Sequence, residues 1–234
     1  MQPASQKAAT PIRDAASILV VNRQAQDGPS ILMGQRGTSA AFMPSKYVFP
    51  GGAVDPEDAG VLLGGQLSAQ SHDRLMMEPR NDVPTAPRAI AAAALRELVE
   101  ETGLIAGRPG TPPPTWPKYG AAGLAPDPSG LIYFFRAITP PRLSRRFDAR
   151  FLLLDANRLH GDITDFSAAG DELSHLHWVP IDQARKLDLP FITEIVLAEL
   201  ARLLQDCANA PLVDPARVPF FDNRTDQPRF AHIT

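Results

Sequence analysis

Segment 85–103 carries the pattern that most constrains the fold. Apolar residues recur there at helical spacing as far as Leu98. Thr85 can serve as N-cap, and Gly103 is placed to end the helix at C′. The run of small alanines at 91–94 would let this helix pack very close to a sheet. We therefore expect a helix over 85–102 that lies against β structure.

Three glutamates, Glu97, Glu100 and Glu101, occupy the last turn of this expected helix. Their spacing puts them on one face, where like charges repel, and the partial negative charge of a helix C-terminus penalises them further. Arg96 can pair with Glu100 at i+4, but it cannot neutralise all three. Because Mg²⁺ prefers carboxylate and phosphate oxygens, a divalent cation is the simplest explanation of the cluster. The alternative is a solvated acidic face.

Composition excludes several classes of function. At 234 residues and 44% hydrophobic content, the chain can bury the core of one elaborated domain. A net charge of -3 provides no general basic field, so we expect no nucleic-acid partner. Cys207 is the only cysteine, which excludes an internal disulfide and favours a reducing compartment, with the cytoplasm expected. We expect neither an export signal nor a membrane anchor, because no apolar run approaches roughly 18 residues.

Short apolar runs bounded by turn residues predict several strands. The expected strands are 17–21, 30–33, 47–49, 131–138, 147–154 and 173–179, with a second helix at 191–204. Segment 107–130 is crowded with Pro and Gly and is expected to be a surface loop. Strands and helices in mixed order imply an α/β or α+β layered domain. We expect a flexible N-terminus over 1–15, one domain over 16–205 and a C-terminal extension over 206–234.

Residues 96–104 read Arg-Glu-Leu-Val-Glu-Glu-Thr-Gly-Leu. This run resembles, without a mismatch, the second half of the Nudix box, R-E-U-x-E-E-x-G-U with U apolar. The first half, G-x5-E, resembles Gly52 followed by Asp58, or Gly51 followed by Glu57 in a register shifted by one. Residues 59–84 would then be an insertion within the box. The resemblance implies a Nudix α/β/α sandwich with a mixed sheet.

The split box, together with segments 42–56, 139–141 and 145–148, resembles one Nudix subfamily in particular, the peroxisomal coenzyme A diphosphatases and their bacterial relatives. Arg36 resembles a remnant of a further coenzyme A motif, whose second arginine is replaced here by Ala41. The resemblance implies hydrolysis of a nucleoside diphosphate linked to another group, with coenzyme A or acyl-coenzyme A favoured. The implied partner is a small-molecule nucleotide, and the chain could act as a homodimer.

Three other functions stay open at this stage. One is hydrolysis of ADP-ribose or NADH by the same chemistry. Another is a Nudix-fold sensor that binds a nucleotide without cleaving it, although a pure binder has no need of the complete glutamate set. A third is a Nudix-fold isomerase acting on an isoprenoid diphosphate, which would want a cysteine near the site, whereas Cys207 lies in the distal helix end.

The resemblance also implies roles for individual residues. Glu97, Glu100 and Glu101 would hold Mg²⁺ or Mn²⁺, with Glu97 and Glu101 binding most directly, and a carbonyl of Gly51 or Gly52 would supply another oxygen. Arg96 would orient these carboxylates.

Two further sets of residues are candidates outside the box. Glu172 lies six residues before Trp178 and is the candidate fourth metal ligand or general base, the alternative being an ordinary exposed loop acid. Guanidinium groups suit phosphate, so Arg36 and either Arg146 or Arg150 are candidates to bind the substrate. Strand alternation places Arg146, Asp148 and Arg150 on one face, and salt bridges to Asp148 and Asp155 are the alternative role of these arginines.

Overall fold

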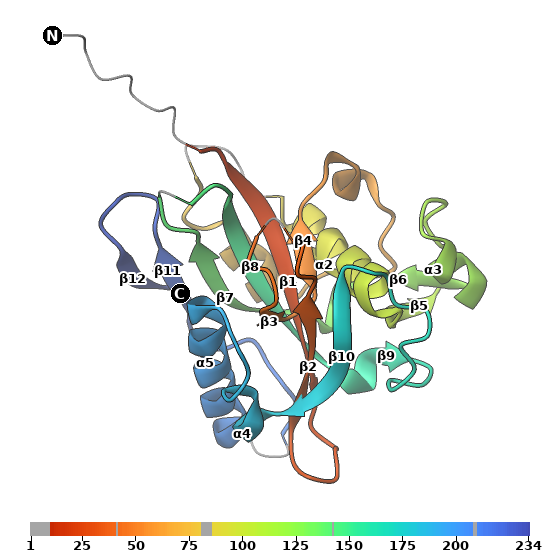
Figure 1. The fold of residues 1–234 in the computed structure, drawn as a ribbon. Helices are drawn as coiled ribbons and strands as arrows, with labels where there is room; N and C mark the ends of the chain where they lie inside the picture. Colours follow the sequence, from red (N-terminus) through yellow and green to blue (C-terminus); the bar gives the residue numbers. More distant parts are fainter. Residues whose placement is uncertain (1–9, 41, 81–85, 142, 208–209) are drawn as a thin grey trace, which may run out of the picture.

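The computed structural model describes residues 10–40, 42–80, 86–141, 143–207 and 210–234. Figure 1 shows a large mixed sheet with helices on both faces. Along the sheet the strand order is β10-β2-β1-β8-β7-β11-β12, with β3 paired to β2 and β4 paired to β1. The bounds of these strands are β1 (Ile12–Asn22), β2 (Ser30–Arg36), β3 (Tyr47–Val48), β4 (Gly51–Ala53), β7 (Ile132–Ile138), β8 (Arg146–Asp155), β10 (Leu173–Pro180), β11 (Val218–Asp222) and β12 (Arg229–Ile233).

A smaller sheet and five α-helices complete the described fold. The smaller sheet has the order β6-β5-β9, formed by β5 (Ile105–Pro109), β6 (Leu124–Pro126) and β9 (Leu159–His160). The helices are α1 (Ala69–Met76), α2 (Pro87–Thr102), α3 (Pro117–Ala122), α4 (Ile181–Ala184) and α5 (Phe191–Cys207). Short 3-10 turns lie at Pro56–Gly60, Pro128–Gly130 and Ala156–Arg158. Among the described residues, no helix is long and apolar enough to cross a membrane.

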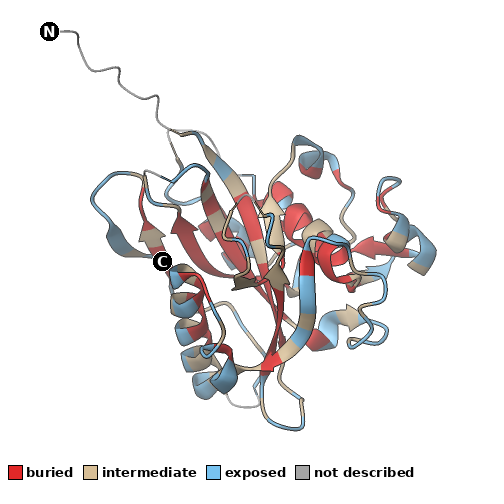
Figure 2. Ribbon diagram, viewed as in Figure 1, coloured by how far each residue is buried: buried red, intermediate tan, exposed pale blue. Residues whose placement is uncertain are grey.

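The central strands β1 and β8 run parallel and are buried on both faces. Side chains alternate along a strand, so Ile18 and Val20 join the core under α2, whereas Leu19 and Val21 join the core under α5. Figure 2 shows buried residues along these strands and along the inner side of both helices. The result is a three-layer α/β/α arrangement, as predicted.

Helix α2 confirms the predicted helix, with a different start. It begins at Pro87 with Ala86 at the N-cap position and no side-chain cap, while Thr85 lies outside the described residues. Alanines 91–94 are fully buried, which lets α2 lie close against β1 and β4. Gly103 ends the helix in the left-handed conformation, with a φ of 79°.

The expectation of a structureless loop over 107–130 is wrong. Pro117 starts helix α3, because proline is tolerated in a first turn, and Gly123 ends it with a φ of 65°. Strand β6 then returns along β5. The proline and glycine content of this segment therefore marks the ends of short elements.

The predicted end segments also belong to the sheet. Residues from Ile12 onward form β1, so only 1–9 of the expected flexible N-terminus lie outside the described residues. In the expected C-terminal extension, β11 pairs in parallel with β7, and Phe220 lies opposite Arg136. The main sheet is incomplete without residues 218–233.

The 59–84 insertion packs against the C-terminal segment. Its helix α1 carries Ser68 and Ser71, whose hydroxyls both donate to Asp214, and Arg74 donates to the carbonyl of Ala216 at 2.7 Å. The two segments that lie outside the expected core of the domain therefore support one another.

Candidate active site

Two glycines of β4 bring the backbone against the acidic end of α2. A Cβ on Gly51 would lie 2.5 Å from the carbonyl oxygen of Ala16, and a Cβ on Gly52 would lie 2.2 Å from Oε1 of Glu97. At Gly51 the nearest atoms are backbone atoms, so glycine is required there, whereas a Cβ on Gly52 would displace the Glu97 carboxylate. The amide of Gly51 donates to Oε2 of Glu101 at 2.8 Å, which fixes that carboxylate against the strand.

The three glutamates of α2 differ in exposure. Glu101 is 3% exposed, the Glu97 side chain is 12% exposed, and the Glu100 side chain is 56% exposed. Lys118 of α3 donates to the carbonyl of Val99 at 2.9 Å and so places a positive charge at the C-terminal end of α2. This cation offsets part of the electrostatic cost that the sequence pattern indicates.

Arg96 joins the two halves of the split box. It donates to the Asp58 carboxylate at 2.9 and 3.0 Å and to the carbonyl of Ala53 at 3.0 Å. Its Nη1 also donates to Glu97 at 2.8 Å and to Glu100 at 3.1 Å. The predicted pairing with Glu100 is confirmed, and the strongest partner of Arg96 is a residue from the far side of the insertion.

Burial controls the protonation of the two inner glutamates. It raises the pKa of Glu101 to about 8 and the pKa of Glu97 to about 7, and the negative charge of Glu172 adds to both shifts. Arg96 opposes the shift at Glu97, and the Gly51 amide opposes it at Glu101. A cation between these carboxylates would remove the cost of keeping them charged.

The donor set fits a divalent cation. Among the described residues, no three His, Cys, Asp or Glu side chains already converge as a ligand cluster. Arg96 donates to both Glu97 and Glu100. Glu97 and Glu101 nevertheless present carboxylate oxygens beside the backbone of Gly51 and Gly52, and hard divalent cations prefer oxygen ligands.

Glu172 reaches the same site from a different element. It precedes β10, and its loop is anchored to α2 because the amide of Gly170 donates to the carbonyl of Glu100 at 2.9 Å. A Cβ on Gly170 would lie 2.7 Å from that carbonyl, so the loop can approach only with glycine there. Glu172 lines one cavity together with Glu97 and Glu100.

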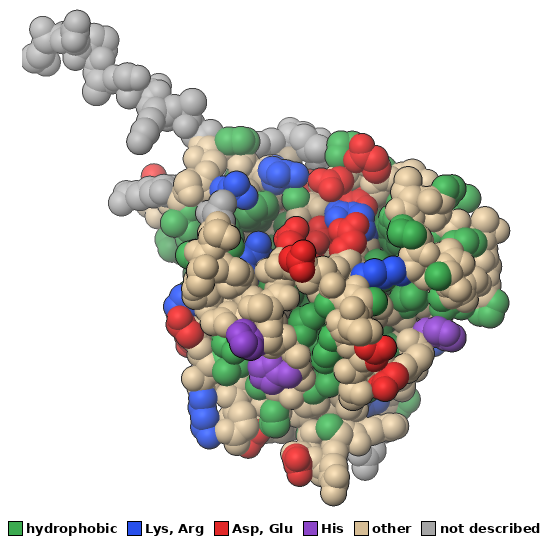
Figure 3. Space-filling view, turned by 45° about the vertical axis from the view of Figure 1, so that its right-hand side comes forward, with side chains coloured by type: hydrophobic (Ala, Val, Ile, Leu, Met, Phe, Trp, Pro, Cys, Tyr) green, Lys and Arg blue, Asp and Glu red, His purple; other side chains and the backbone are tan. Residues whose placement is uncertain are grey.

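This cavity has a volume of about 680 Å³ and adjoins the acidic residues. Figure 3 shows acidic side chains gathered on one face of the molecule with basic side chains beside them. Arg36 of β2 also lines the cavity, and its Nε is buried without a hydrogen-bond partner among the described residues. A guanidinium group that lines a cavity is suited to an anionic ligand.

Comparisons with known proteins place the chain in a family. A crystal structure of a NUDIX hydrolase from Alicyclobacillus acidocaldarius matches with 30% sequence identity and a TM-score of 0.59, covering 86% of this chain and 94% of that one. The chain belongs to the Nudix hydrolase family. A Caenorhabditis elegans protein with the curated name "Putative nudix hydrolase 7" is 30% identical over 185 residues, which is 71% of this chain. The chain spans about half, 51%, of that relative's length. No family model matches the chain.

The structure distinguishes the two acids that the sequence offered for the first half of the Nudix box. Asp58 is 1% exposed and bonded to Arg96, whereas Glu57 is exposed, which favours the register from Gly52 to Asp58. Both registers were open in the sequence because the two acids are adjacent. The sequence analysis named Asp58 as one of two candidate acids but did not predict that it pairs with Arg96.

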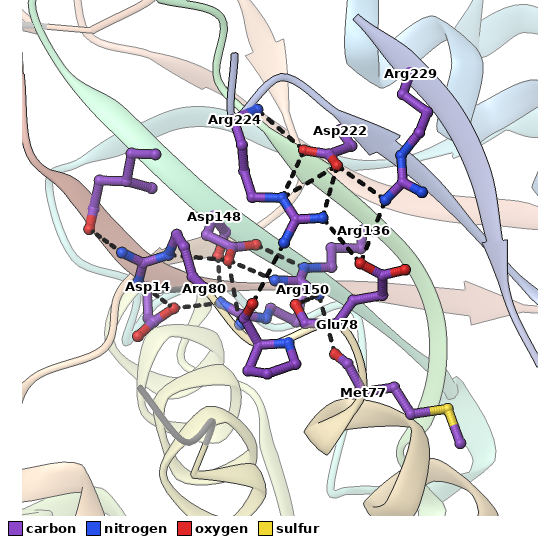
Figure 4. A network of polar contacts seen from close by, with 12 residues as sticks. Asp14, Met77, Glu78, Arg80, Arg136, Asp148, Arg150, Asp222, Arg224 and Arg229 are labelled. Carbon is purple, nitrogen blue, oxygen red and sulfur yellow. Dashed lines mark hydrogen bonds and ion pairs between the residues drawn. The ribbon is translucent and has the colours of Figure 1, made fainter. Parts of the chain in front are cut away.

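The prediction that Arg146 or Arg150 binds the substrate is corrected, because neither lines the cavity. Arg146 is 7% exposed and donates to the carbonyls of Thr139 and Asn223 at 3.0 and 2.7 Å. Arg150 is 1% exposed and pairs with Asp148 and Asp14. Figure 4 shows Arg150 within a network of ionic contacts that also includes Asp14, Asp148 and Arg80.

The alternative role of these arginines, ionic pairing, is confirmed in part. Asp148 is the shared partner, accepting from Arg136 at 2.8 and 2.9 Å as well as pairing with Arg150. Asp155 instead pairs with Arg23 at 2.7 Å. Among the described residues of this turn, Arg145 is the basic residue that lines the cavity.

Proposed function

We propose that this Nudix hydrolase uses a divalent metal ion to cleave the diphosphate of a nucleoside diphosphate linked to another moiety. A coenzyme A or acyl-coenzyme A type substrate is the leading candidate, by the resemblance of the split box. The observation that carries the proposal is the pair of buried carboxylates, Glu97 and Glu101, held beside the Gly51–Gly52 backbone. Of these residues, Gly51, Gly52 and Glu97 line a large cavity.

The residues of the site divide the work of binding the metal. Glu97 and Glu101 would hold Mg²⁺ or Mn²⁺ most directly, with the carbonyl of Gly52 and the exposed Glu100 as further oxygen donors. When bound, such an ion neutralises charge on the phosphate oxygens and lowers the pKa of a water molecule. Arg96 positions Glu97 and Glu100 through its own bonds to Asp58.

Glu172 and Arg36 complete the proposed machinery. Glu172 accepts the proton of the attacking water or serves as a fourth metal ligand, since it lines the cavity on a loop fixed to α2. Arg36 donates from its guanidinium group to a phosphate oxygen, and its charge also lowers the pKa of Glu101 against the larger effect of burial. Both side chains come from β-strands or their ends and not from the Nudix helix.

Incubation of the purified chain with Mg²⁺ and a substrate panel tests this proposal. The panel contains coenzyme A, an acyl-coenzyme A, ADP-ribose and NADH, and phosphate-containing products are identified by mass. We expect coenzyme A compounds to be cleaved fastest. Preferential cleavage of ADP-ribose or NADH would support diphosphate hydrolysis but overturn the proposed coenzyme A substrate. Tight nucleotide binding without any product would instead indicate a non-catalytic sensor.

A pair of charge-neutralising variants links the activity to the site. Glu101→Gln should lower kcat/KM by about 100-fold or more, since even residues that only support metal ligands are worth 10- to 100-fold. Glu57→Gln is the matched control, because Glu57 is an exposed acid of the same box outside the cavity. Equal activity of the two variants would remove Glu101 from the mechanism.

The cellular setting stays a prediction. Cys207 as the only cysteine favours a reducing compartment, and we propose the cytoplasm. A small nucleotide is the proposed partner, and a homodimer can be tested by light scattering.

A further inference from the structure

The cavity extends well beyond its acidic end, and its far part is lined by aromatic rings. These are Phe42, Phe49, Phe147, Phe151, Phe191 and Phe221, which we call the aromatic chamber. Phe147 and Phe151 point from β8 to the face that α5 covers, and Phe191 is the first residue of α5. The chamber and the acidic residues therefore share one continuous space.

Two polar side chains near the chamber, Asn223 and Thr139, already have hydrogen-bond partners within the protein. The amide nitrogen of Asn223 donates to the carbonyl of Ile138 at 2.9 Å, and the hydroxyl of Thr139 accepts from the amide of Phe147 at 3.0 Å. A pocket that binds a nucleobase needs free hydrogen-bond donors and acceptors, because it is costly to bury the polar edge of the base without partners. The chamber wall is better matched to a group with few polar atoms.

The shape of the chamber indicates an elongated group. The sheet residues that line the whole cavity include members of β1, β8, β7 and β11, which are consecutive in the large sheet. Three steps of about 4.8 Å between neighbouring strands give a length of roughly 14 Å from the strand beside the acidic end to β11. A compact ring would fill only part of this distance, whereas an extended chain would follow it.

We propose that the aromatic chamber binds an extended apolar arm attached to the substrate diphosphate on the side opposite the nucleoside, with Phe191 as a specificity-determining residue. This inference rests on the proposed diphosphate hydrolysis. Phe191 is 67% exposed at the cavity and makes an edge contact with Phe221 at 6.3 Å between ring centroids. An arm that reaches β11 covers this exposed ring, so apolar surface of the protein and of the substrate is buried together.

A series of linear alkyl esters of ADP, from methyl to octyl, isolates the contribution of the arm because the nucleoside diphosphate is constant. With Mg²⁺ present, kcat/KM should rise about threefold to fourfold for each added methylene until the chamber is filled. ADP-ribose, whose arm is polar, should resemble the methyl ester. A kcat/KM that is flat or falls along the series overturns the proposal.

Two phenylalanine variants test the location of the arm. Phe191→Ser should lower kcat/KM of the octyl ester about tenfold more than that of the methyl ester. Phe230→Ser is the matched control, since Phe230 is 51% exposed on β12 beside Phe221 but does not line the cavity, and it should leave the methyl-to-octyl ratio unchanged. Equal ratios in the two variants would place the arm elsewhere.

The outcome also separates this inference from the proposed function. If the enzyme cleaves every ester at the same rate, the diphosphate chemistry stands and the aromatic chamber has another occupant. If no ester, coenzyme A compound or ADP-ribose gives product with Mg²⁺ or Mn²⁺, the proposed function itself fails. A flat ester series in which replacing adenosine by a methyl group abolishes binding would assign the chamber to the nucleobase and overturn the inference.

Discussion

Replacement of Gly52 by alanine tests whether the position of the Glu97 carboxylate sets activity. The new Cβ would lie 2.2 Å from Oε1, 2.5 Å from Cδ and 2.8 Å from Oε2 of Glu97. Because ordinary non-bonded contacts begin near 3.4 Å, the carboxylate must retreat by about 1 Å. A misplacement of this size at a reacting centre costs about 100-fold, so we expect kcat/KM of Gly52→Ala to fall by that factor.

Steady-state hydrolysis of coenzyme A at saturating Mg²⁺ measures this effect, and urea unfolding of the same samples measures stability. We expect little loss of stability, because the Glu97 side chain borders the cavity and has room to move. Gly37→Ala is the control, since a Cβ there meets no atom within 4 Å, and its activity should stay near that of the unmodified chain. Activity of Gly52→Ala within threefold of the unmodified chain would refute the role assigned to the Glu97 position.

Three other perturbations have defined outcomes. Asp148→Ala removes a fully buried carboxylate shared by arginines, and urea unfolding should show a loss of about 3–5 kcal/mol, whereas a loss below 1 kcal/mol would contradict the buried network. Burial raises the pKa values of Glu97 and Glu101 to about 7 and about 8, so their contribution to the stability of the metal-free protein is present at low pH and lost as pH rises through these values. The increase in melting temperature caused by Mg²⁺ should therefore grow from pH 6 to pH 8. A pH-independent increase would contradict this. Removal of metal with EDTA should abolish hydrolysis, and added Mg²⁺ or Mn²⁺ should restore it; turnover that persists in EDTA would exclude the metal-dependent mechanism.

Local patterns predicted the elements that carry the site, but not the pairing that decides its register. The helical spacing, the alanines and Gly103 were enough to predict α2 and the common face of its glutamates. Glu57 and Asp58 are adjacent carboxylates, so no local rule distinguishes them. Only the packing of the 3-10 turn against α2 buries one of them beside Arg96 and leaves the other in solvent.

The arginines of β8 illustrate the same limit. Alternation along the strand correctly placed Arg146, Asp148 and Arg150 on one face. Phe147, Ala149 and Phe151 of β8 line the cavity. Asp148 and Arg150 point to the other face of β8, where they pair with Arg80 of the insertion and Asp14 of β1, which are distant in sequence. Neither contact leaves a periodic signal in the sequence.

The two halves of the box can assemble because the insertion adds little loop-closure entropy and because Asp58 and Arg96, which flank it, are hydrogen-bonded to each other. Lengthening the connection between Asp58 and Arg96 from the roughly 7 residues of a continuous box to 37 adds about 1.5 kcal/mol of closure entropy. A hydrogen bond to a charged group is worth about 1.5–3 kcal/mol, and Arg96 makes two to the buried Asp58. The pairing therefore offsets the cost of the insertion at the point where the box must close. Arg96 also donates to Glu97, so the side chain that binds Asp58 and closes the box also positions a proposed metal ligand.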